Sequence, residues 1–337
     1  LASQGKYESI VLDFREDIPA TEIAAQVSTI AQKYNVTPQL NSEFSAKDNV
    51  YIIKGNSETL KSLRKSKLAK ATEYIEPNYI YRALEIPNDP DYAKQWNLRS
   101  INIESAWDET KGSGVTVAVI DTGISRVPDL QDTKFVEGYD FVNDRVEAED
   151  DNGHGTHVAG TVAQSTNNNY GVAGVAYEAN LMPLKVLDDF GGGTISDIAE
   201  AIKFAADKGA DVINMSLGGG GESQLMQDAI NYAHQKGVVI IAAAGNSNEN
   251  SASYPARYPQ VISVAAIDSA GEKAPYSNYG AGVDISAPGG SDSGKILQET
   301  IDPETRQPIF VGFQGTSMAA PHVAGVAALI KAAGVKE

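Results

Sequence analysis

A serine stands at the predicted start of an apolar helix near the end of the chain. Ser317 lies in the segment 315–321, and the apolar pattern that follows predicts a helix over 319–332. N–H groups at a helix start are unpaired and carry partial positive charge, so they stabilise negative charge that develops nearby. A serine there could attack a carbonyl carbon, but serine is also a common N-cap. Pro321 is unusual for a purely structural helix, because proline removes a hydrogen bond.

An aspartate and a pair of histidines occur in separate segments. Asp121 ends the apolar run 117–121, and such an aspartate alone is a weak signal. The segment 152–160 predicts the start of a helix and carries His154 and His157. Metal binding is the rival interpretation of this pair, but the histidines lack a Glu partner at helical spacing. Together, the Asp121, histidine and Ser317 motifs would supply an orienting acid, a base and a nucleophile.

An amide side chain completes the set. Asn246 follows the apolar run 242–244 and Gly245, where Gly-Asn usually shapes a turn. Acyl transfer also needs hydrogen-bond donors aimed at the oxyanion of the tetrahedral intermediate. The Asn246 side chain and the Ser317 N–H would provide two.

The region beyond residue 90 alternates between predicted strands and helices. Its almost wholly apolar strands are typical of a parallel sheet buried on both faces. The predicted strands cover 115–120, 181–186, 212–216, 238–243 and 261–266, and the predicted helices cover 157–165, 195–208 and 222–236. The fold class is therefore α/β, with a doubly wound, mostly parallel sheet. In such a sheet, sites form outside the carboxyl ends of the strands.

The N-terminal region predicts a separate small α+β domain. Strands over 9–14, 36–44, 49–54 and 73–83 and helices over 20–34 and 57–69 give the order βαββαβ, that of a ferredoxin-like plait. The segment 86–90 contains two prolines and predicts a linker. We expect two domains, over 1–84 and 85–337.

Composition excludes several classes of protein. The net charge is −17: residues 1–84 carry a net charge of +1, and the part after residue 84 carries −18, from 16 Lys/Arg and 34 Asp/Glu. Such an acidic surface argues against nucleic acid or an anionic membrane as a partner. No run is long and apolar enough for a membrane span. The chain has no cysteine, so thiol chemistry, thiolate metal sites and disulfides are excluded.

At Asp121, His157, Ser317 and Asn246 the chain resembles the subtilases, the subtilisin-like serine proteases, over residues 89–337. The order Asp, His, Ser along the chain is theirs. The resemblance implies a broad-specificity serine endopeptidase in which Asp121 orients His157, His157 acts as base and then acid, Ser317 is the nucleophile, and Asn246 stabilises the oxyanion. Two alternatives stay open: a transpeptidase or macrocyclase, and a catalytically silent form that binds its own propeptide.

The same resemblance implies a groove for protein or peptide substrates. One wall would be the glycine run 191–193, which could otherwise be only a flexible loop, and the other would follow Ser216. An extended peptide would add between them as a strand. The implied substrate-binding residues are Gly191, Gly192, Gly193, Ser216, Leu217, Gly218, Gly245 and Ser253, with Ser253 at the base of an apolar pocket.

Structural calcium is implied by similarity to thermitase-like subtilases. Oxygen ligands on a flexible loop suit Ca²⁺. The implied ligands are Asp89, Asp129, Ser165, Asn168, Tyr170 and Val172, although the loop 165–172 could be a solvated turn. A second acidic run is compatible with another ion or with a charged surface loop: Asp140, Asp144, Glu147, Glu149, Asp150 and Asp151.

The resemblance finally implies a monomeric, secreted zymogen. The domain 1–84 would be an inhibitory and chaperoning propeptide bound in the groove, with self-cleavage near residues 82–86. We expect the signal peptide to be absent from this sequence. Two features depart from the family pattern: only 20 residues follow Ser317, which suggests a truncated C-terminus, and residues 290–313 form a polar insertion, predicted to be a hairpin turning at 301–305.

Overall fold

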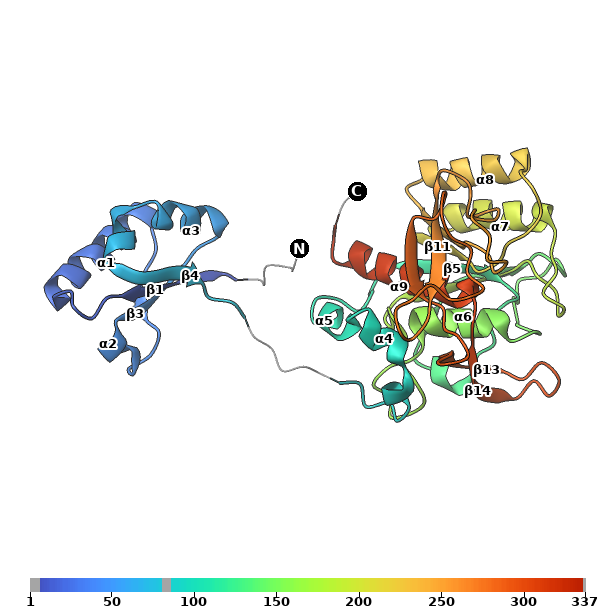
Figure 1. Ribbon diagram of the computed structural model, residues 1–337, viewed down its shortest axis with the longest axis horizontal. Coiled ribbons are helices and arrows are strands. Elements are labelled where there is room, and N and C mark those ends of the chain that lie inside the picture. The colour runs from blue at the N-terminus through green and yellow to red at the C-terminus, as the bar shows by residue number, and fades with distance from the viewer. Residues whose placement is uncertain (1–6, 81–85, 336–337) are drawn as a thin grey trace. The chain divides into compact units, whose positions relative to one another are not determined.

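The chain forms two compact units in a computed structural model that describes residues 7–80 and 86–335 (Figure 1). The first unit comprises residues 1–83 and the second residues 84–337. The predicted strand end and cleavage region at 81–85 lies outside the described residues.

The N-terminal unit is a four-stranded antiparallel sheet with helices. Its sheet order is β2-β3-β1-β4. Ile10, Leu12 and Phe14 alternate along β1 and are fully buried, where they meet Ile23 and Ile30 of α1. The elements are β1 (Ser9–Phe14), α1 (Ala20–Tyr34), β2 (Gln39–Leu40), α2 (Ser45–Asp48), β3 (Val50–Lys54), α3 (Ser57–Arg64), the 3₁₀ helix η1 (Lys67–Lys70) and β4 (Thr72–Pro77).

Three elements of this unit are shorter than the sequence predicts. The strand predicted over 73–83 ends at Pro77, as β4. The strand predicted over 36–44 is reduced to the two residues of β2. The helix predicted over 57–69 ends at Arg64, because the Ser66 hydroxyl donates to the Leu63 carbonyl and accepts from the Leu68 N–H. A serine that bonds to its own neighbouring backbone competes with helix continuation in this way.

The second unit is built on an eight-stranded sheet of order β12-β11-β10-β9-β5-β8-β6, with β7 also paired to β8. Every pairing in it is parallel. The strands are β5 (Thr116–Asp121), β6 (Lys134–Phe135), β7 (Tyr139–Asp140), β8 (Asn180–Lys185), β9 (Val212–Met215), β10 (Val239–Ala243), β11 (Val261–Ile267) and β12 (Ile285–Pro288). The predicted mostly parallel α/β fold is confirmed.

Helices cover both faces of this sheet (Figure 1). Along β5, Val117 and Val119 face the core with α6 and α9, and Ala118 and Ile120 face the core with α7 and α8. The helices are α4 (Trp96–Ser100), α5 (Ile103–Trp107), α6 (His154–Ala163), α7 (Ile195–Asp207), α8 (Gln224–Gln235) and α9 (Thr316–Ala332), with 3₁₀ turns η2 (Tyr92–Lys94) and η3 (Pro128–Leu130). Burial of both strand faces explains why the strands show no polar alternation.

Two helices begin three residues earlier than predicted, and both starts matter for the site. α6 begins at His154 and not at 157, and α9 begins at Thr316 and not at 319. The insertion 290–313 contains the antiparallel hairpin of β13 (Ile296–Ile301) and β14 (Pro308–Phe313), so the predicted hairpin is confirmed.

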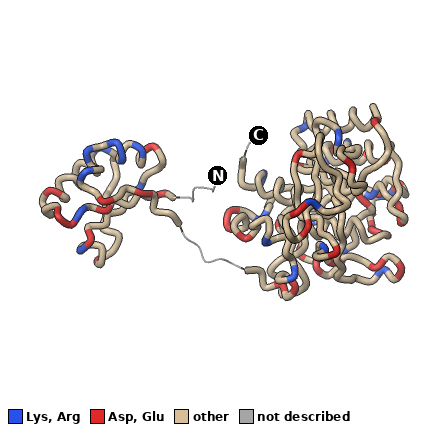
Figure 2. Tube along the Cα trace, viewed as in Figure 1, with Lys and Arg blue, Asp and Glu red and all other residues tan. Residues whose placement is uncertain are grey.

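Charge is distributed differently in the two units. Figure 2 shows Lys and Arg gathered along α3 and η1 of the N-terminal unit, where Lys61, Arg64, Lys65, Lys67 and Lys70 lie.

Among the described residues, no helix has both the length and the apolar character needed to cross a membrane.

Candidate active site

An aspartate and a histidine meet at the end of β5. His154 Nδ1 lies 2.7 Å from Asp121 Oδ1. Asp121 is fully buried, whereas the His154 side chain keeps 27% of its surface exposed. Gly155 permits this approach, because a Cβ there would lie 2.2 Å from the Gly123 carbonyl oxygen. Burial tends to lower the pKa of His154, but the charge and hydrogen bond of Asp121 outweigh it and raise the pKa above its usual value.

His157, predicted to be the base beside Asp121, lies elsewhere, and that prediction is wrong. Its ring is fully buried, its Nε2 is 3.0 Å from the Ile296 carbonyl oxygen, and it stacks on Phe313 with ring centroids 4.4 Å apart. Burial lowers its pKa to about 3. His157 therefore joins α6 to the β13–β14 hairpin as a neutral ring that donates a hydrogen bond.

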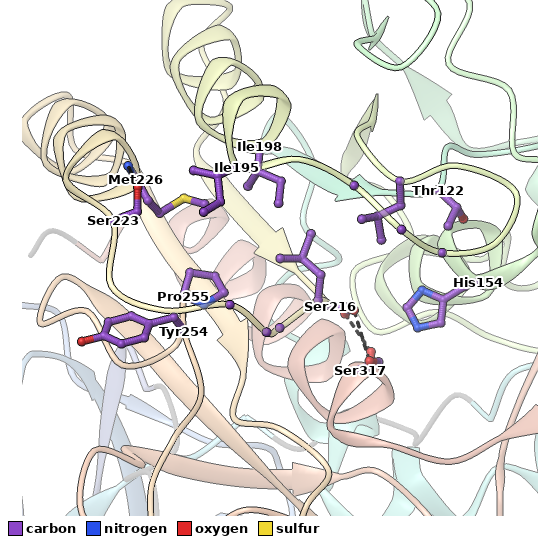
Figure 3. Close-up of a pocket in the computed structure, with 18 of the residues that line it drawn as sticks. Thr122, His154, Ile195, Ile198, Ser216, Ser223, Met226, Tyr254, Pro255 and Ser317 are labelled. Carbon is purple, nitrogen blue, oxygen red and sulfur yellow. Dashed lines mark hydrogen bonds between the residues drawn. The ribbon is translucent and has the colours of Figure 1, made fainter.

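Ser317 lies in the first turn of α9, and Pro321 explains part of its setting. The missing N–H of Pro321 leaves the Ser317 carbonyl without its i+4 helical donor. The Ser216 hydroxyl donates to that carbonyl at 2.8 Å, and the Ser317 hydroxyl donates to the Ser216 carbonyl at 3.1 Å. This reciprocal pair joins α9 to the end of β9. Figure 3 shows Ser317 and the His154 ring facing the same pocket.

Asn246 is held by the residue before Ser317. Its Oδ1 accepts from the Thr316 N–H at 2.8 Å and from the Thr316 hydroxyl at 2.9 Å. Because both Thr316 groups are donors, the amide oxygen is occupied and Nδ2 remains available to a ligand. Asn246 lines the same pocket as His154 and Ser317.

A groove of about 660 Å³ contains these side chains. One side comes from the loop after β8 and the start of α7, and the other from the segment after β9 and the start of α8. Its apolar lining suits apolar side chains of a ligand. The apolar lining residues are Leu187, Phe190, Ile195, Ile198, Leu217, Met226, Tyr254, Pro255 and Tyr258.

Most of the predicted groove residues do line this groove. They are Gly191, Gly192, Gly193, Ser216, Leu217 and Gly218. Gly245 and Ser253 are not among its lining residues; Ser253 Oγ instead accepts from Asn278 Nδ2 at 3.2 Å. The groove also includes Thr122, Asn152 and Tyr254, which sequence reasoning missed. Their closeness to Asp121, His154 and Ser253 in the chain was the available signal.

Three of the predicted calcium ligands contact a fourth, Asp129, but each of the three does so through an N–H group and not through an oxygen atom. Asp129 is fully buried and accepts from Asn168 Nδ2 at 2.8 Å and from the Val172 N–H at 2.9 Å, and the Ser165 N–H donates to its carbonyl at 2.8 Å. Burial, with smaller effects of Glu299 and Asp89, raises the pKa of Asp129 to about 7. Among the described residues, no three His, Asp or Glu side chains are arranged to hold a metal ion.

Asp89 and Tyr170 complete this region. Asp89 is buried, and its carboxylate accepts from the Asn167 N–H at 2.9 Å. The Tyr170 hydroxyl donates to Glu299 Oε1 at 3.0 Å, and Glu299 Oε2 accepts from the Asp129 N–H at 2.6 Å. Glu299, on β13, was not predicted as part of this region. It links the hairpin to the loop 165–172.

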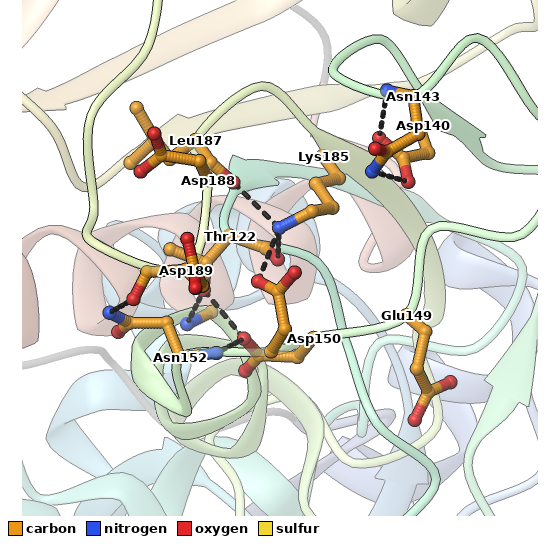
Figure 4. Close-up of polar contacts among 12 residues, drawn as sticks. Thr122, Asp140, Asn143, Glu149, Asp150, Asn152, Lys185, Leu187, Asp188 and Asp189 are labelled. Atoms are coloured by element: carbon orange, nitrogen blue, oxygen red, sulfur yellow. Dashed lines mark hydrogen bonds and ion pairs between the residues drawn. The ribbon is translucent and has the colours of Figure 1, made fainter. Parts of the chain in front are cut away.

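In the second acidic run, Asp140, Glu149 and Asp150 lie apart and have different partners (Figure 4). Asp140 accepts from Asn143 Nδ2 at 2.8 Å and pairs with Arg145 Nε at 3.0 Å. Asp150 accepts from the side chains of Thr122 and Thr156 and from nearby N–H groups. These carboxylates hold the loop before α6, which agrees with a charged loop and not with a second ion site.

Comparison with known proteins agrees with this geometry. The model of the "Subtilase family" matches residues 112–335, which is most of the chain. The chain is a subtilase. It is also 41% identical over 328 residues to "Thermophilic serine proteinase" of Bacillus sp. (strain AK1), covering 96% of this chain and 78% of the relative. It is 43% identical to "Thermitase" of Thermoactinomyces vulgaris, covering 74% of this chain and 86% of the relative.

A solved structure shares the fold. The chain matches a structure described as proteases from Pseudoalteromonas arctica PAMC 21717, with a TM-score of 0.70 and 41% identity. The match covers 74% of this chain and 87% of that one. The subtilase is therefore a subtilisin-like serine endopeptidase, a hydrolase that acts on protein substrates.

Proposed function

We propose that Asp121, His154 and Ser317 form the catalytic triad of a broad-specificity endopeptidase. The observation that carries this proposal is the 2.7 Å contact of His154 Nδ1 with Asp121 Oδ1 beside Ser317 in one groove. With Nδ1 donating to Asp121, Nε2 is the basic atom. The Ser317 hydroxyl turns from the Ser216 carbonyl to His154, gives up its proton, and Oγ attacks the scissile carbonyl carbon.

Asn246 and the Ser317 N–H stabilise the oxyanion that this attack creates. The Thr316 contacts orient Asn246 so that Nδ2 is the free end of the amide. Protonated His154 then donates its proton to the leaving amine. In the second half of the reaction His154 takes a proton from water, the water oxygen attacks the acyl carbon, and the Ser317 oxygen leaves with the proton that His154 returns. An extended substrate lying between the glycine segment 191–193 and Leu217–Gly218 presents its side chains to the apolar lining.

The N-terminal unit acts, in this proposal, as a ferredoxin-like propeptide of a zymogen that cleaves itself near residues 82–86. Its sheet order and helices support the assignment. The match to the Bacillus relative extends over 96% of this chain and so includes this unit. A parallel sheet has mainly non-local contacts and folds slowly, so a folding template is physically useful.

Self-processing predicts two fragments from the refolded wild-type chain and none from Ser317→Ala. The fragments are separated on a denaturing gel and the new N-terminus is sequenced. Adding a trace of active enzyme to the variant controls for its ability to be cut. A Ser317→Ala chain that is clipped at the same bond without added enzyme would refute self-processing.

Calcium would bind near Asp129, with oxygen atoms of Asp89, Asp129 and Asn168 and carbonyls of the loop 165–172 as ligands. Buried carboxylates with raised pKa values fit a divalent cation, which would offset their burial. We expect saturable binding when Ca²⁺ is titrated into the chelated protein, and loss of that binding in Asp129→Asn. Equal binding by wild type and variant would place the ion elsewhere.

Secretion and a monomeric state complete the proposal. A further relative, 44% identical, is named "Extracellular protease" of Xanthomonas campestris pv. campestris. That name supports an extracellular location for this chain.

A further inference from the structure

A buried lysine lies directly beside the catalytic groove. Lys185 ends β8, and its side chain has no exposed surface. Its ammonium donates to the Thr122 carbonyl at 2.8 Å, to the Leu187 carbonyl at 2.7 Å and to Asp151 Oδ1 at 2.6 Å (Figure 4). All three N–H donors of the ammonium are therefore used, and its charge is paired.

These three acceptors belong to different parts of the site. Thr122 follows Asp121 and lines the groove. Leu187 begins the groove wall that continues to Gly193, with which it forms a β-bridge. Asp151 lies in the loop that leads to His154 and α6. Lys185 thus connects the segments that carry Asp121 and His154 to the groove wall 187–193.

The neighbouring contacts form a continuous polar bridge. The Val186 and Leu187 N–H groups donate to the Asp121 carbonyl at 2.9 and 3.2 Å, so the wall also holds the backbone of the acid. Asn152 Nδ2 donates to the Asp189 carbonyl at 2.9 Å, and Asn152 Oδ1 accepts from the His154 N–H at 3.2 Å. A shift of the wall therefore reaches both members of the Asp121–His154 pair.

We propose that Lys185 is a positioning residue. It fixes the position of the groove wall 187–193 relative to the Asp121–His154 pair. It touches neither the reacting atoms nor the substrate. Its effect is on register: a peptide seated on the wall presents its scissile carbonyl to Ser317 only when the wall and the pair keep their relative position. This inference rests on the proposed triad and extends it to recognition of extended substrates.

A long-chain ammonium suits this position for a physical reason. Two backbone carbonyls from different segments point to one site beside a lysine side chain with no exposed surface, where an unpartnered carbonyl would be costly. The ammonium satisfies both carbonyls, and Asp151 compensates its charge. Methionine has similar length but cannot donate, so Lys185→Met would leave both carbonyls without a partner and allow the wall to move.

The test compares a long with a short substrate on the processed enzyme. The long substrate is an extended tetrapeptide anilide that occupies the wall, and the short one is an N-acetyl ester of a single amino acid. We expect Lys185→Met to reduce kcat/KM for the tetrapeptide up to about 100-fold more than for the ester, the loss that a misplacement of about 1 Å can cause. Lys208→Met, which removes an exposed lysine paired with Glu137 at 2.8 Å, is the matched control and should leave the ratio unchanged.

The ratio separates positioning from stability. A loss of folded enzyme lowers the rates for both substrates equally and leaves the ratio of their kcat/KM values unchanged. A ratio in Lys185→Met that equals the wild-type ratio would therefore overturn the proposal. Lys185→Gln, which is shorter and uncharged, provides the same readout if the Met variant does not fold. Failure of both variants to fold would also overturn it, since Lys185 would then serve the fold itself. Failure of the proposed triad is distinct, because His154→Ala would then hydrolyse both substrates at rates close to those of the wild type.

Discussion

Replacing His154 with alanine is expected to lower kcat about 10⁶-fold, the loss that removal of the catalytic histidine causes in subtilisin. Without the His154 ring, no described residue at hydrogen-bond distance from Asp121 can take the Ser317 proton. The measurement is steady-state hydrolysis of a tetrapeptide anilide by purified, processed enzyme, with folding checked by circular dichroism. Processing of the inactive variant requires addition of the mature enzyme or separate expression of the two units.

His157→Ala is the matched control, because it makes the same change three residues further along α6. His157 contacts the hairpin carbonyls and Phe313, and not Asp121. We expect a lower melting temperature and a kcat per folded molecule that stays within about tenfold of the wild type. A loss of activity in His157→Ala with full activity in His154→Ala would restore the assignment made from the sequence and contradict the structure.

Asp121→Asn is expected to lower kcat on the order of 10⁴-fold, as the same change does in the chymotrypsin triad. An asparagine can offer its N–H to Nδ1, which favours the tautomer with its proton on Nε2 and makes His154 a poor base. The charge of Asp121 also raises the pKa of His154 above its usual value. Removing that charge therefore lowers the pKa.

The pH profile distinguishes this explanation from simple misfolding. His154 must be neutral to act as a base, so kcat/KM falls as the pH drops through its pKa in the free enzyme. As the pH is lowered, the wild type should therefore begin to lose activity at a pH that is still above the ordinary histidine pKa of about 6.5. The residual activity of Asp121→Asn should persist to a lower pH. An acid limb that does not move would show that another group titrates there. Asp121→Glu, which keeps the charge at a different length, controls for the charge alone.

Much of this architecture follows from the sequence because apolar strands that are buried on both faces have a plain signature. The runs around Val117, Leu181, Val212 and Ile240 correspond to β5, β8, β9 and β10 within one or two residues. The hairpin in the insertion was also predictable, since a proline-containing polar turn separates two strand-like runs. Secondary structure that is set by local composition is accessible in this way.

The choice between the two histidines was not predictable from spacing. His154 and His157 lie about one helical turn apart, so either could face the end of β5. The decision depends on where α6 begins. Gly153 adopts a positive φ of 94° and starts the helix at His154, which leaves only that end of the helix at the groove, whereas His157 is enclosed by β13 and β14. One signal was present: His157 directly precedes the apolar pair Val158-Ala159, which favours burial.

The acidic residues show a second limit of sequence reasoning. Asp140 and Asp150 have the composition of an ion site, but their partners are Arg145, Asn143, Thr122 and Thr156. Glu299 reaches Asp129 across 170 positions of the chain. Lys185 similarly acts through carbonyl groups, which carry no sequence signature. Contacts of this kind depend on the folded backbone and cannot be read from residue spacing.

The most direct test of the account is covalent labelling of the serine. A fluorophosphonate is added to the processed wild type, to His154→Ala and to His157→Ala, and the modified peptide is mapped by mass spectrometry over time. The proposed triad predicts one adduct, on Ser317, that forms at similar rates in the wild type and His157→Ala and more slowly by several orders of magnitude in His154→Ala. Rapid labelling of Ser317 in His154→Ala, or an adduct on another residue of the wild type, would contradict it.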